Sequence, residues 1–475
     1  MKQSNSKLLK LFFSIAFMLG GILFFTFFIS SPDKLFFKDN YVPSDVWDYA
    51  AQINQGLISD WFSPLFLIEN IGIKKICEGI LGFPIDALDM IAWVNIALLS
   101  ISSFVLCIWC SRYSQHYASL IIISIILSLG ICWSCKLGRV GLDSAFVTPF
   151  ILSIEFIFQT VKANKKSTRF LYAILLVIML IHTVSFRKNF ILLVPYYFWI
   201  ISAVLIKPIS LKNRFFVTSF GTLFLYLAAN TLVNTSVQAI KTYPLIPMCA
   251  SEIGIAKQLN GNTQDDTYRL VSSPVFETKL QATANFENLN WAKVGIEHTA
   301  DKKIRVREGC SEIWETLKKL YIQEWINHPC EMMEAKLLEV SDFYLMGKRP
   351  DILVNFISDR HPNVNIDILK DSQKASSFLS YIPGSERSWG VAFMLLLLIY
   401  IRKFGQKTWQ KAELDFLSHI IILPTLYILT FMIITPTIDY RYTTYMNVFY
   451  LFACLIVFFA ILKNATTSFS AIKTK

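Results

Sequence analysis

The sequence of 475 residues has few charged side chains. Asp, Glu, Lys and Arg together make up 17% of the chain, whereas a soluble domain averages about 25%. Hydrophobic residue types make up 54%, 39 residues are Phe, and the mean hydropathy is +0.47. A water-soluble protein of this composition could not cover its surface with polar groups, so a soluble fold is excluded.

Acidic residues are scarcer than basic ones. There are 34 Asp and Glu against 45 Lys and Arg, which gives a net charge of +11. In a soluble protein this excess of basic residues would suggest nucleic acid as a binding partner. Here most Lys and Arg lie in short gaps between apolar runs, where orientation in a membrane explains them. Nucleic acid is therefore not expected as a partner.

Histidine is rare, with six residues, and no His-rich set of metal ligands stands out. The sequence predicts no metal and no other cofactor, although the carboxylates described below could bind a divalent cation. Two CxxC pairs, Cys107/Cys110 and Cys132/Cys135, lie in or beside apolar runs without a histidine partner. We interpret them as helix packing rather than as metal or redox sites.

Long apolar runs are abundant. Runs of about 20 residues match the thickness of a bilayer core. They predict ten spans at residues 10–30, 89–110, 117–135, 144–161, 170–185, 191–206, 215–234, 389–402, 415–434 and 443–462. The first run lacks a small-residue cleavage motif, so we expect a signal-anchor helix there. The expected fold class is an all-α polytopic membrane protein.

The predicted spans divide the chain into three parts. Residues 1–234 form an N-terminal membrane module with seven spans and a first outer loop at 31–88. Residues 235–388 are polar and numerous enough to fold as a domain. Residues 389–475 form a C-terminal membrane module with three spans.

Helical patterns are also visible outside the predicted spans. In the polar domain, residues 311–345 have a helical period that Pro329 divides into two helices, so the domain is expected to be mainly α with mixed elements. In the first outer loop, Val46–Ile58 predicts an amphipathic helix at the membrane interface.

The distribution of Lys and Arg sets the orientation. One set of gaps, together with the two termini, holds 18 basic residues, and the short gaps of the other set hold five. The positive-inside rule then puts both termini in the cytoplasm, and the loop 31–88 and the domain 235–388 in the periplasm of a bacterial inner-membrane protein. One or two disulfides of unassigned pairing could form among the four cysteines that would face this oxidising side, which are Cys77, Cys249, Cys310 and Cys330.

Basic residues on the outer side oppose this orientation rule and need a reason. They form three clusters, each with polar neighbours: Lys136 and Arg139 with Asp143, Arg187 and Lys188 with Asn189, and Arg441 with Asp439 and Tyr442. A single one could be a side chain that snorkels at a helix end. Three clusters at one depth could line a shared cavity, where Arg and Lys would bind the phosphate of a lipid.

Two carboxylates of the first outer loop could supply a base. Asp45 and Asp48 are three residues apart, which places both on one face of a helix. Transfer of a sugar from a lipid phosphate to a hydroxyl needs one group that takes the hydroxyl proton and several cations that stabilise the leaving phosphate. Asp45 follows Pro43 and Ser44, so a helix N-cap is the alternative interpretation.

The order of these motifs resembles that of GT-C-fold glycosyltransferases. Asp45 precedes Tyr49 by four residues and Asp60-Trp61 by fifteen, and Gly56 and Pro64 fall at the expected places. The family's loop begins with two adjacent acids, whereas Val46 follows Asp45 here, so Asp45 and Asp48 both stay open as the base. Three further stretches are similar to family motifs: Arg187-Lys188-Asn189, Trp325–Pro329 and Asp439-Tyr440-Arg441-Tyr442.

The resemblance implies a polyprenyl-phosphate-linked sugar as the donor and transfer on the outer face of the inner membrane. Size, topology and the large outer loop look most like bacterial and phage-encoded O-antigen glucosyltransferases that convert serotype. A lipopolysaccharide O-antigen would then be the acceptor, and a flippase and a donor-synthesising transferase would be partners.

The resemblance also implies roles for the residues. The base would be Asp45 or Asp48. Five basic residues would hold the donor phosphate: Lys136, Arg139, Arg187, Lys188 and Arg441. Six others would orient the sugar or these cations: Asp60, Trp61, Asp143, Asn189, Asp439 and Tyr442.

Two other functions stay open. An O-antigen polymerase or ligase also has about ten spans and a large outer loop, but it would not need the acidic segment between Asp45 and Pro64. A lipid-linked-sugar flippase or other transporter should have broken helices, inverted repeats and charges near the midplane. In this sequence the outer charges lie at helix ends and no internal repeat is visible.

Overall fold

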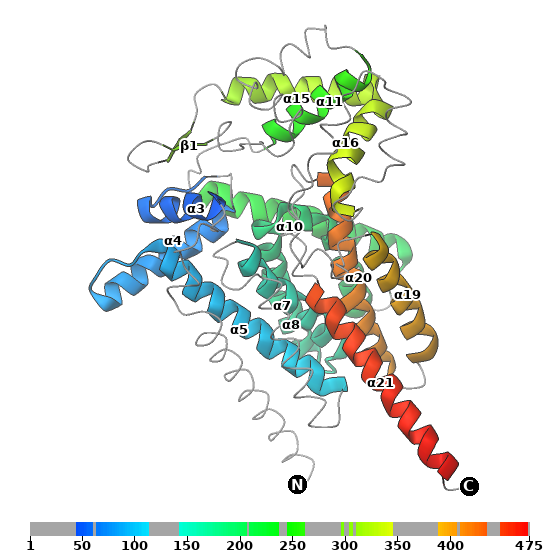
Figure 1. Cartoon of the computed structure of the whole chain (residues 1–475). Helices are drawn as coiled ribbons and strands as arrows, with labels where there is room; N and C mark the ends of the chain where they lie inside the picture. Colours follow the sequence, from blue (N-terminus) through cyan, green and yellow to red (C-terminus); the bar gives the residue numbers. More distant parts are fainter. Residues whose placement is uncertain are drawn as a thin grey trace.

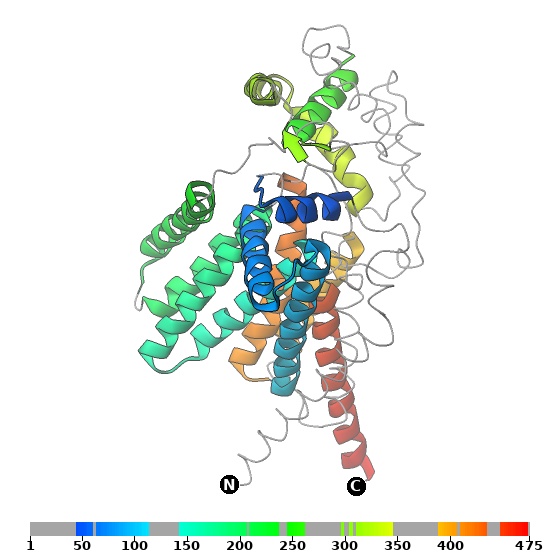
Figure 2. The same ribbon diagram turned by 90° about the vertical axis from the view of Figure 1, so that its left-hand side faces the viewer.

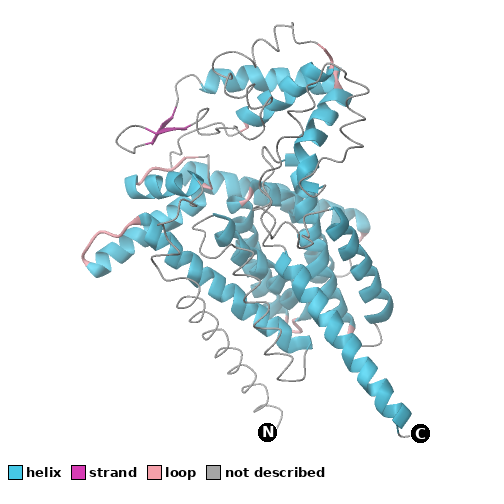
Figure 3. Ribbon diagram, viewed as in Figure 1, coloured by secondary structure: helices cyan, strands magenta, loops and turns pink. Residues whose placement is uncertain are grey.

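The structure is a computed structural model. It describes residues 44–59, 63–113, 142–206, 209–236, 245–261, 296–298, 304–306, 310–344, 388–405, 409–434 and 447–473. Within these ranges the chain is almost entirely helical, as Figures 1 and 3 show.

Most of the helices form one bundle, seen from two sides in Figures 1 and 2. They are α3 (Ser44–Gln55), α4 (Pro64–Leu81), α5 (Ala87–Tyr113), α7 (Leu142–Lys162), α8 (Lys166–Phe186), the 3-10 helix η2 (Lys188–Leu193), α9 (Val194–Leu205), α10 (Leu211–Ser236), α19 (Ser388–Phe404), α20 (Lys411–Ile434) and α21 (Asn447–Lys473). A second group lies at one end of this bundle. It contains α11 (Ile246–Leu259), α15 (Cys310–Asn327) and α16 (Pro329–Tyr344), and two short antiparallel strands lie nearby, β1 (Ile296–His298) and β2 (Ile304–Val306).

Five stretches among the described residues are long and apolar enough to cross a membrane. They are Ala87–Cys110, Ala145–Lys162, Lys166–Phe186, Lys188–Leu205 and Lys411–Thr430. These helices are those of an all-α, multi-pass membrane protein. The predicted spans 215–234, 389–402 and 443–462 overlap helices α10, α19 and α21, which are not among these five stretches. The predicted spans 10–30 and 117–135 lie outside the described residues.

Aromatic rings fill the centre of the bundle. Phe146 of α7 lies 5.2 Å from Tyr427 of α20, and Phe150 lies 5.3 Å from Phe190 of η2, measured between ring centroids. All four side chains are fully buried. Such ring pairs add to the gain from apolar burial, so they hold α7, η2 and α20 together.

Polar side chains inside the bundle join neighbouring helices in pairs. The hydroxyl groups of Ser102 (α5) and Thr148 (α7) are 2.8 Å apart, and those of Ser153 (α7) and Tyr197 (α9) are also 2.8 Å apart. Glu155 of α7 accepts a hydrogen bond from Trp109 and pairs with Arg112, both on α5. A polar group surrounded by hydrocarbon is costly without a partner, so these pairs help to fix which helices are neighbours.

One end of the bundle, called the basic end below, carries the Lys and Arg residues of the gaps between α7 and α8 and between α19 and α20. Arg169 at the start of α8 donates to the carbonyl oxygens of Ala163 and Val204, which lie at the ends of α7 and α9. Arg402 near the end of α19 pairs with Asp415 near the start of α20 at 2.8 Å. The far end of α21 also lies on this side (Figure 1).

The group of α11, α15 and α16, on the side away from the basic end, contains buried charges. Lys336 pairs with Glu252 at 2.8 Å, and the Tyr321 hydroxyl donates to the other oxygen of Glu252 at 2.6 Å. Lys257 pairs with Glu324 at 2.7 Å. The four charged side chains are at most 8% exposed. Burial and the neighbouring Glu252 carboxylate raise the pKa of Tyr321 above its ordinary value.

The predicted division of residues 311–345 is confirmed. Helix α15 ends at Asn327, and α16 begins at Pro329, where the missing N–H costs nothing because the first helical N–H groups have no intrahelical partner. Leu317 of α15 is buried. Tyr321 and Trp325 pack against the cluster of α11 and α16 side chains.

Three of the four outer cysteines are described, and they carry thiols rather than disulfides: Cys77, Cys249 and Cys330. The side chain of Cys310 lies outside the described residues. Of the two CxxC pairs, Cys110 is fully buried in the bundle core, in agreement with a packing role. The side chain of Cys107 and residues Cys132 and Cys135 lie outside the described part.

We expect Glu252→Ala to destabilise the group of α11, α15 and α16. The change leaves the Lys336 charge buried without its carboxylate, at a cost of about 3–5 kcal/mol. The result would be faster tryptic cleavage within residues 310–344 of the purified protein. Glu315→Ala is the matched control, because Glu315 pairs with Lys318 on the exposed side of α15 and such pairs contribute little. Equal cleavage rates for both variants would contradict this account.

Candidate functional site

The structure describes part of the predicted site. Asp45 and Asp48 belong to α3, and Asp143 belongs to the first turn of α7, but their side chains lie outside the described residues. Arg187, Lys188 and Asn189 are fully described. The remaining predicted residues lie outside the described part of the chain: Asp60, Trp61, Lys136, Arg139, Asp439, Arg441 and Tyr442.

Helix α3 is held on the bundle by one face and by its end. Tyr49, Ala50 and Ile53 are buried, at the spacing of one side of a helix. The Asn54 side chain accepts a hydrogen bond from the backbone N–H of Ala87 at the start of α5. Gly56 has a φ of +66°, which suits glycine, and it ends α3 with the paired hydrogen bonds of a Schellman motif.

Helix α4 begins with strong local signals. Ser63 caps the helix, because its hydroxyl accepts a hydrogen bond from the N–H of Phe66, and Pro64 occupies the first helical position. Gly56 and Pro64, which contribute to the family resemblance, thus each have a local folding reason, as does Ser63. Their presence alone is no evidence for catalysis.

A ladder of three aromatic rings joins α3, α4 and α8. The Tyr49 ring meets the Phe66 ring edge to face at 5.7 Å, and the Phe66 ring meets Phe186 in the same manner at 6.0 Å. All three side chains are at least nine-tenths buried. Tyr49 directly follows Asp48, and Phe186 directly precedes Arg187. Two ring contacts therefore connect the backbone positions next to Asp48 and next to the basic residue Arg187, which are far apart in the sequence.

The chain turns sharply at the predicted basic cluster. Helix α8 ends at Phe186, Arg187 is extended with φ −136°, and η2 begins at Lys188. The Arg187 side chain is half-buried and Lys188 is exposed. Asn189 is buried and donates to the Thr430 hydroxyl of α20 at 3.0 Å, and Thr430 in turn donates to the Tyr427 carbonyl. This corner, defined as residues 186–189, is thus fixed to α20.

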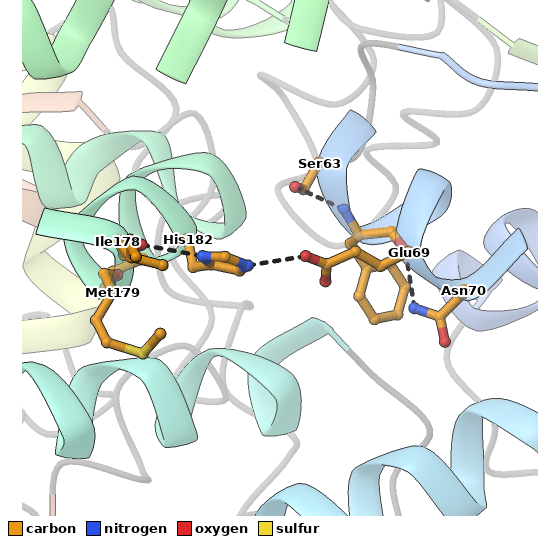
Figure 4. A network of polar contacts seen from close by, with 8 residues as sticks. Ser63, Glu69, Asn70, Ile178, Met179 and His182 are labelled. Atoms are coloured by element: carbon orange, nitrogen blue, oxygen red, sulfur yellow. Dashed lines mark hydrogen bonds and ion pairs between the residues drawn. The ribbon is translucent and has the colours of Figure 1, made fainter. Parts of the chain in front are cut away.

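A pair that the sequence analysis did not select lies beside the corner. His182 of α8 and Glu69 of α4 point toward each other in Figure 4, with 2.9 Å between Nε2 and the carboxylate oxygen. The ring of His182 also contacts Phe186. The two residues are 113 positions apart, so their pairing is not visible in the sequence. A histidine inside the predicted span 170–185 was the available signal, because ionisable groups in spans are commonly functional.

The described residues bring cations to this corner and an acid-bearing helix close to it. Lys188 is open to solvent, Arg187 is partly open, and the Asn189 amide nitrogen is engaged in packing against α20. No group of His, Cys, Asp or Glu able to hold a metal ion occurs among the described residues. The chemistry available at this corner is therefore attraction of an anion.

Comparisons of the chain with family models, with curated proteins and with solved structures find no match.

We expect Asn189→Ala to lower the thermal stability of the purified protein. The change removes the hydrogen bond between η2 and α20, with a cost of about 1 kcal/mol. Thr430→Ala should cost a similar amount. Because both changes remove the same hydrogen bond, the double variant should lose less stability than the sum of the losses in the two single variants.

Thr430→Ser is the control, since it keeps the hydroxyl group that accepts from Asn189. Its denaturation temperature should stay near that of the unmodified protein. Fully additive effects of Asn189→Ala and Thr430→Ala would show that the two side chains stabilise the fold independently.

Proposed function

We propose that the protein is an inverting glycosyltransferase of the GT-C type that uses a polyprenyl-phosphate-linked sugar. The sugar is glucose in this proposal, and the acceptor is the O-antigen of lipopolysaccharide. Transfer takes place on the periplasmic face of the bacterial inner membrane. In this proposal the multi-pass helical protein has ten spans, and residues 235–388 form a mainly α domain in the periplasm.

One observation carries the proposal: the ring ladder from Tyr49 through Phe66 to Phe186. It links the helix that contains Asp45 and Asp48 to the corner that contains Arg187 and Lys188. The proposed reaction needs a base and phosphate-binding cations around one substrate. These two groups are 139 to 143 residues apart in the sequence, so their approach depends on the fold.

The arrangement of charges supports the proposed orientation. The proposal takes the basic end as cytoplasmic, in accordance with the excess of Lys and Arg there. The corner and α3 then lie on the periplasmic side. A lipid-linked sugar would have its phosphate at this depth, where Arg and Lys could bind it.

The transfer step follows from simple chemistry. Asp45 or Asp48 takes the proton of an acceptor hydroxyl, and the hydroxyl oxygen forms a bond to the anomeric carbon from the face opposite the phosphate. The bond between that carbon and the phosphate oxygen breaks, and the phosphate leaves with the electron pair. Arg187 and Lys188 offset the negative charge of the leaving polyprenyl phosphate.

The other predicted residues complete the proposed site. Lys136, Arg139 and Arg441 would add to the phosphate-binding cations, and Asp60, Trp61, Asp143, Asp439 and Tyr442 would orient the sugar or the cations. Asn189 would act by holding the corner, since its amide nitrogen already binds Thr430.

The alternative functions differ in what they require. An O-antigen polymerase or ligase would keep the outward cations but would not need an acid on α3. A flippase would need charges near the membrane midplane. A separate flippase and a donor-synthesising transferase are expected partners of the proposed enzyme, because the donor is made on the other side of the membrane.

We expect one of the two variants Asp45→Asn and Asp48→Asn to reduce glycan modification by about 100-fold or more, because the base can no longer take the proton. Mass spectrometry of surface polysaccharide from cells that express each variant measures the effect. Asp86→Asn is the matched control, because Asp86 caps α5 by accepting from Leu88 N–H and Asn caps equally well.

Full modification by both variants, with the protein still in the membrane, would refute this choice of base. Transport of an unreactive donor analogue across vesicles by either variant would instead favour a flippase.

We expect Arg187→Ala to raise the KM for the lipid-linked donor roughly tenfold, which corresponds to about 1.4 kcal/mol. The reason is loss of a charged hydrogen bond to phosphate. Lys165→Ala is the control, because Lys165 precedes α8 at the basic end. Turnover of the purified enzyme against donor concentration separates KM from kcat. Equal effects of the two changes would count against a phosphate-binding role for Arg187.

A further inference from the structure

His182 lies at the top of an exposed apolar stripe on α8. Phe170, Ile174 and Ile178 are spaced by four residues, as is His182, so all four lie along one side of the helix. The three apolar side chains are 61%, 43% and 39% exposed, while Leu176 and Leu180 on the other side are fully buried. In a membrane this stripe contacts lipid chains.

The histidine lies about one helical turn inside the outer end of the apolar stretch Lys166–Phe186. It precedes the last residue of α8, Phe186, by four positions, which is roughly 6 Å along the helix axis. A lipid whose chain covers Ile174 and Ile178 therefore has its polar part close to the His182 ring. Arg187 and Lys188 follow directly at the corner.

The hydrogen bonds of His182 favour its positive form. Nε2 faces the Glu69 carboxylate at 2.9 Å, and Nδ1 faces the Ile178 carbonyl oxygen at 3.0 Å (Figure 4). The carbonyl oxygen and the ionised carboxylate both accept hydrogen bonds, and a neutral imidazole can donate only one. The imidazolium ion satisfies both contacts.

The pair of His182 and Glu69 is exposed enough for another anion to replace the Glu69 carboxylate beside the histidine. The side chains of His182 and Glu69 are 32% and 34% exposed, unlike the buried ion pairs of α11, α15 and α16. Glu69 lies where α4 leaves the bundle: Phe66, Leu67 and Asn70 are buried, whereas Ile76 and Ile80 farther along are mostly exposed. Figure 1 shows the far half of α4 extending away from the other helices.

We propose that His182 binds the phosphate of a membrane lipid and that Glu69 occupies this position until the lipid phosphate displaces it. The proposal rests on the proposed function, since it makes His182 the first cation that the polyprenyl phosphate meets. Glu69 neutralises the imidazolium in the resting protein, where a lone charge beside lipid would be costly. The incoming phosphate replaces the carboxylate and then reaches Arg187 and Lys188.

The two partners should have opposite effects on binding. His182→Gln removes the cation and should raise the dissociation constant for polyprenyl phosphate about tenfold. Glu69→Gln removes the competing anion but keeps an amide that can hydrogen-bond the ring, so it should lower the same constant several-fold. A purely structural contact between α4 and α8 would make both variants bind worse.

The experiment measures binding of polyprenyl phosphate to the purified full-length protein in phosphatidylethanolamine nanodiscs. Glu78→Gln is the matched control, because Glu78 is also a carboxylate of α4 but pairs with Lys74. It should leave binding unchanged. His182→Arg keeps a cation and should retain binding, which keeps the test decisive if His182→Gln folds poorly.

Competition identifies the source of the phosphate. Addition of phosphatidylglycerol or inorganic phosphate should displace the probe only weakly if the site is selective for the polyprenyl lipid. Strong displacement by phosphatidylglycerol would overturn the assignment to the donor lipid.

The possible failures are distinguishable. If the unmodified protein binds polyprenyl phosphate but neither His182→Gln nor Glu69→Gln changes the binding, or both weaken it, the role of the pair is refuted and the proposed function stands. If the unmodified protein does not bind polyprenyl phosphate, the donor class in the proposed function is refuted as well.

Discussion

Every polar or charged side chain that enters the hydrocarbon layer must find a partner within the protein, and this constraint organises the bundle. The pair of Ser102 and Thr148, the pair of Ser153 and Tyr197, and the contacts of Glu155 with α5 each join two neighbouring helices. Apolar contact alone would be less selective, because lipid chains satisfy apolar surfaces as well as another helix does. The polar pairs thus help to select neighbours, and the rings of Phe146, Phe150, Phe190 and Tyr427 fill the space between them.

Two kinds of ion pair in the structure differ in their exposure. Charges of α11, α15 and α16 are enclosed and serve packing, with Glu252 inaccessible to solvent. The pair of His182 and Glu69 is one-third exposed and lies beside the corner of residues 186–189. A charge that is paired yet reachable is suited to exchange its partner. This difference in exposure, rather than the presence of charge, makes the second pair a candidate for binding.

The sequence predicts features that depend on neighbouring residues and fails where distant residues must meet. Apolar runs locate the helices of the bundle other than α3 and α4, and Pro329 locates the break between α15 and α16. Arg187 and Lys188 stand out because they oppose the distribution of charge. The partners Thr430 for Asn189 and Glu69 for His182 are 241 and 113 residues away. No periodicity encodes such contacts, so only the folded chain identifies them.

The charges shared by α11, α15 and α16 have a consequence for biosynthesis. Glu252 and Lys257 leave the ribosome well before Lys336 and Glu324, because their partners follow 84 and 67 residues later in the chain. Until the later helices emerge, the two early side chains have only water as a partner, and α11 has no reason to bury them. The packing of this group of helices can therefore be completed only after residue 336 has left the ribosome.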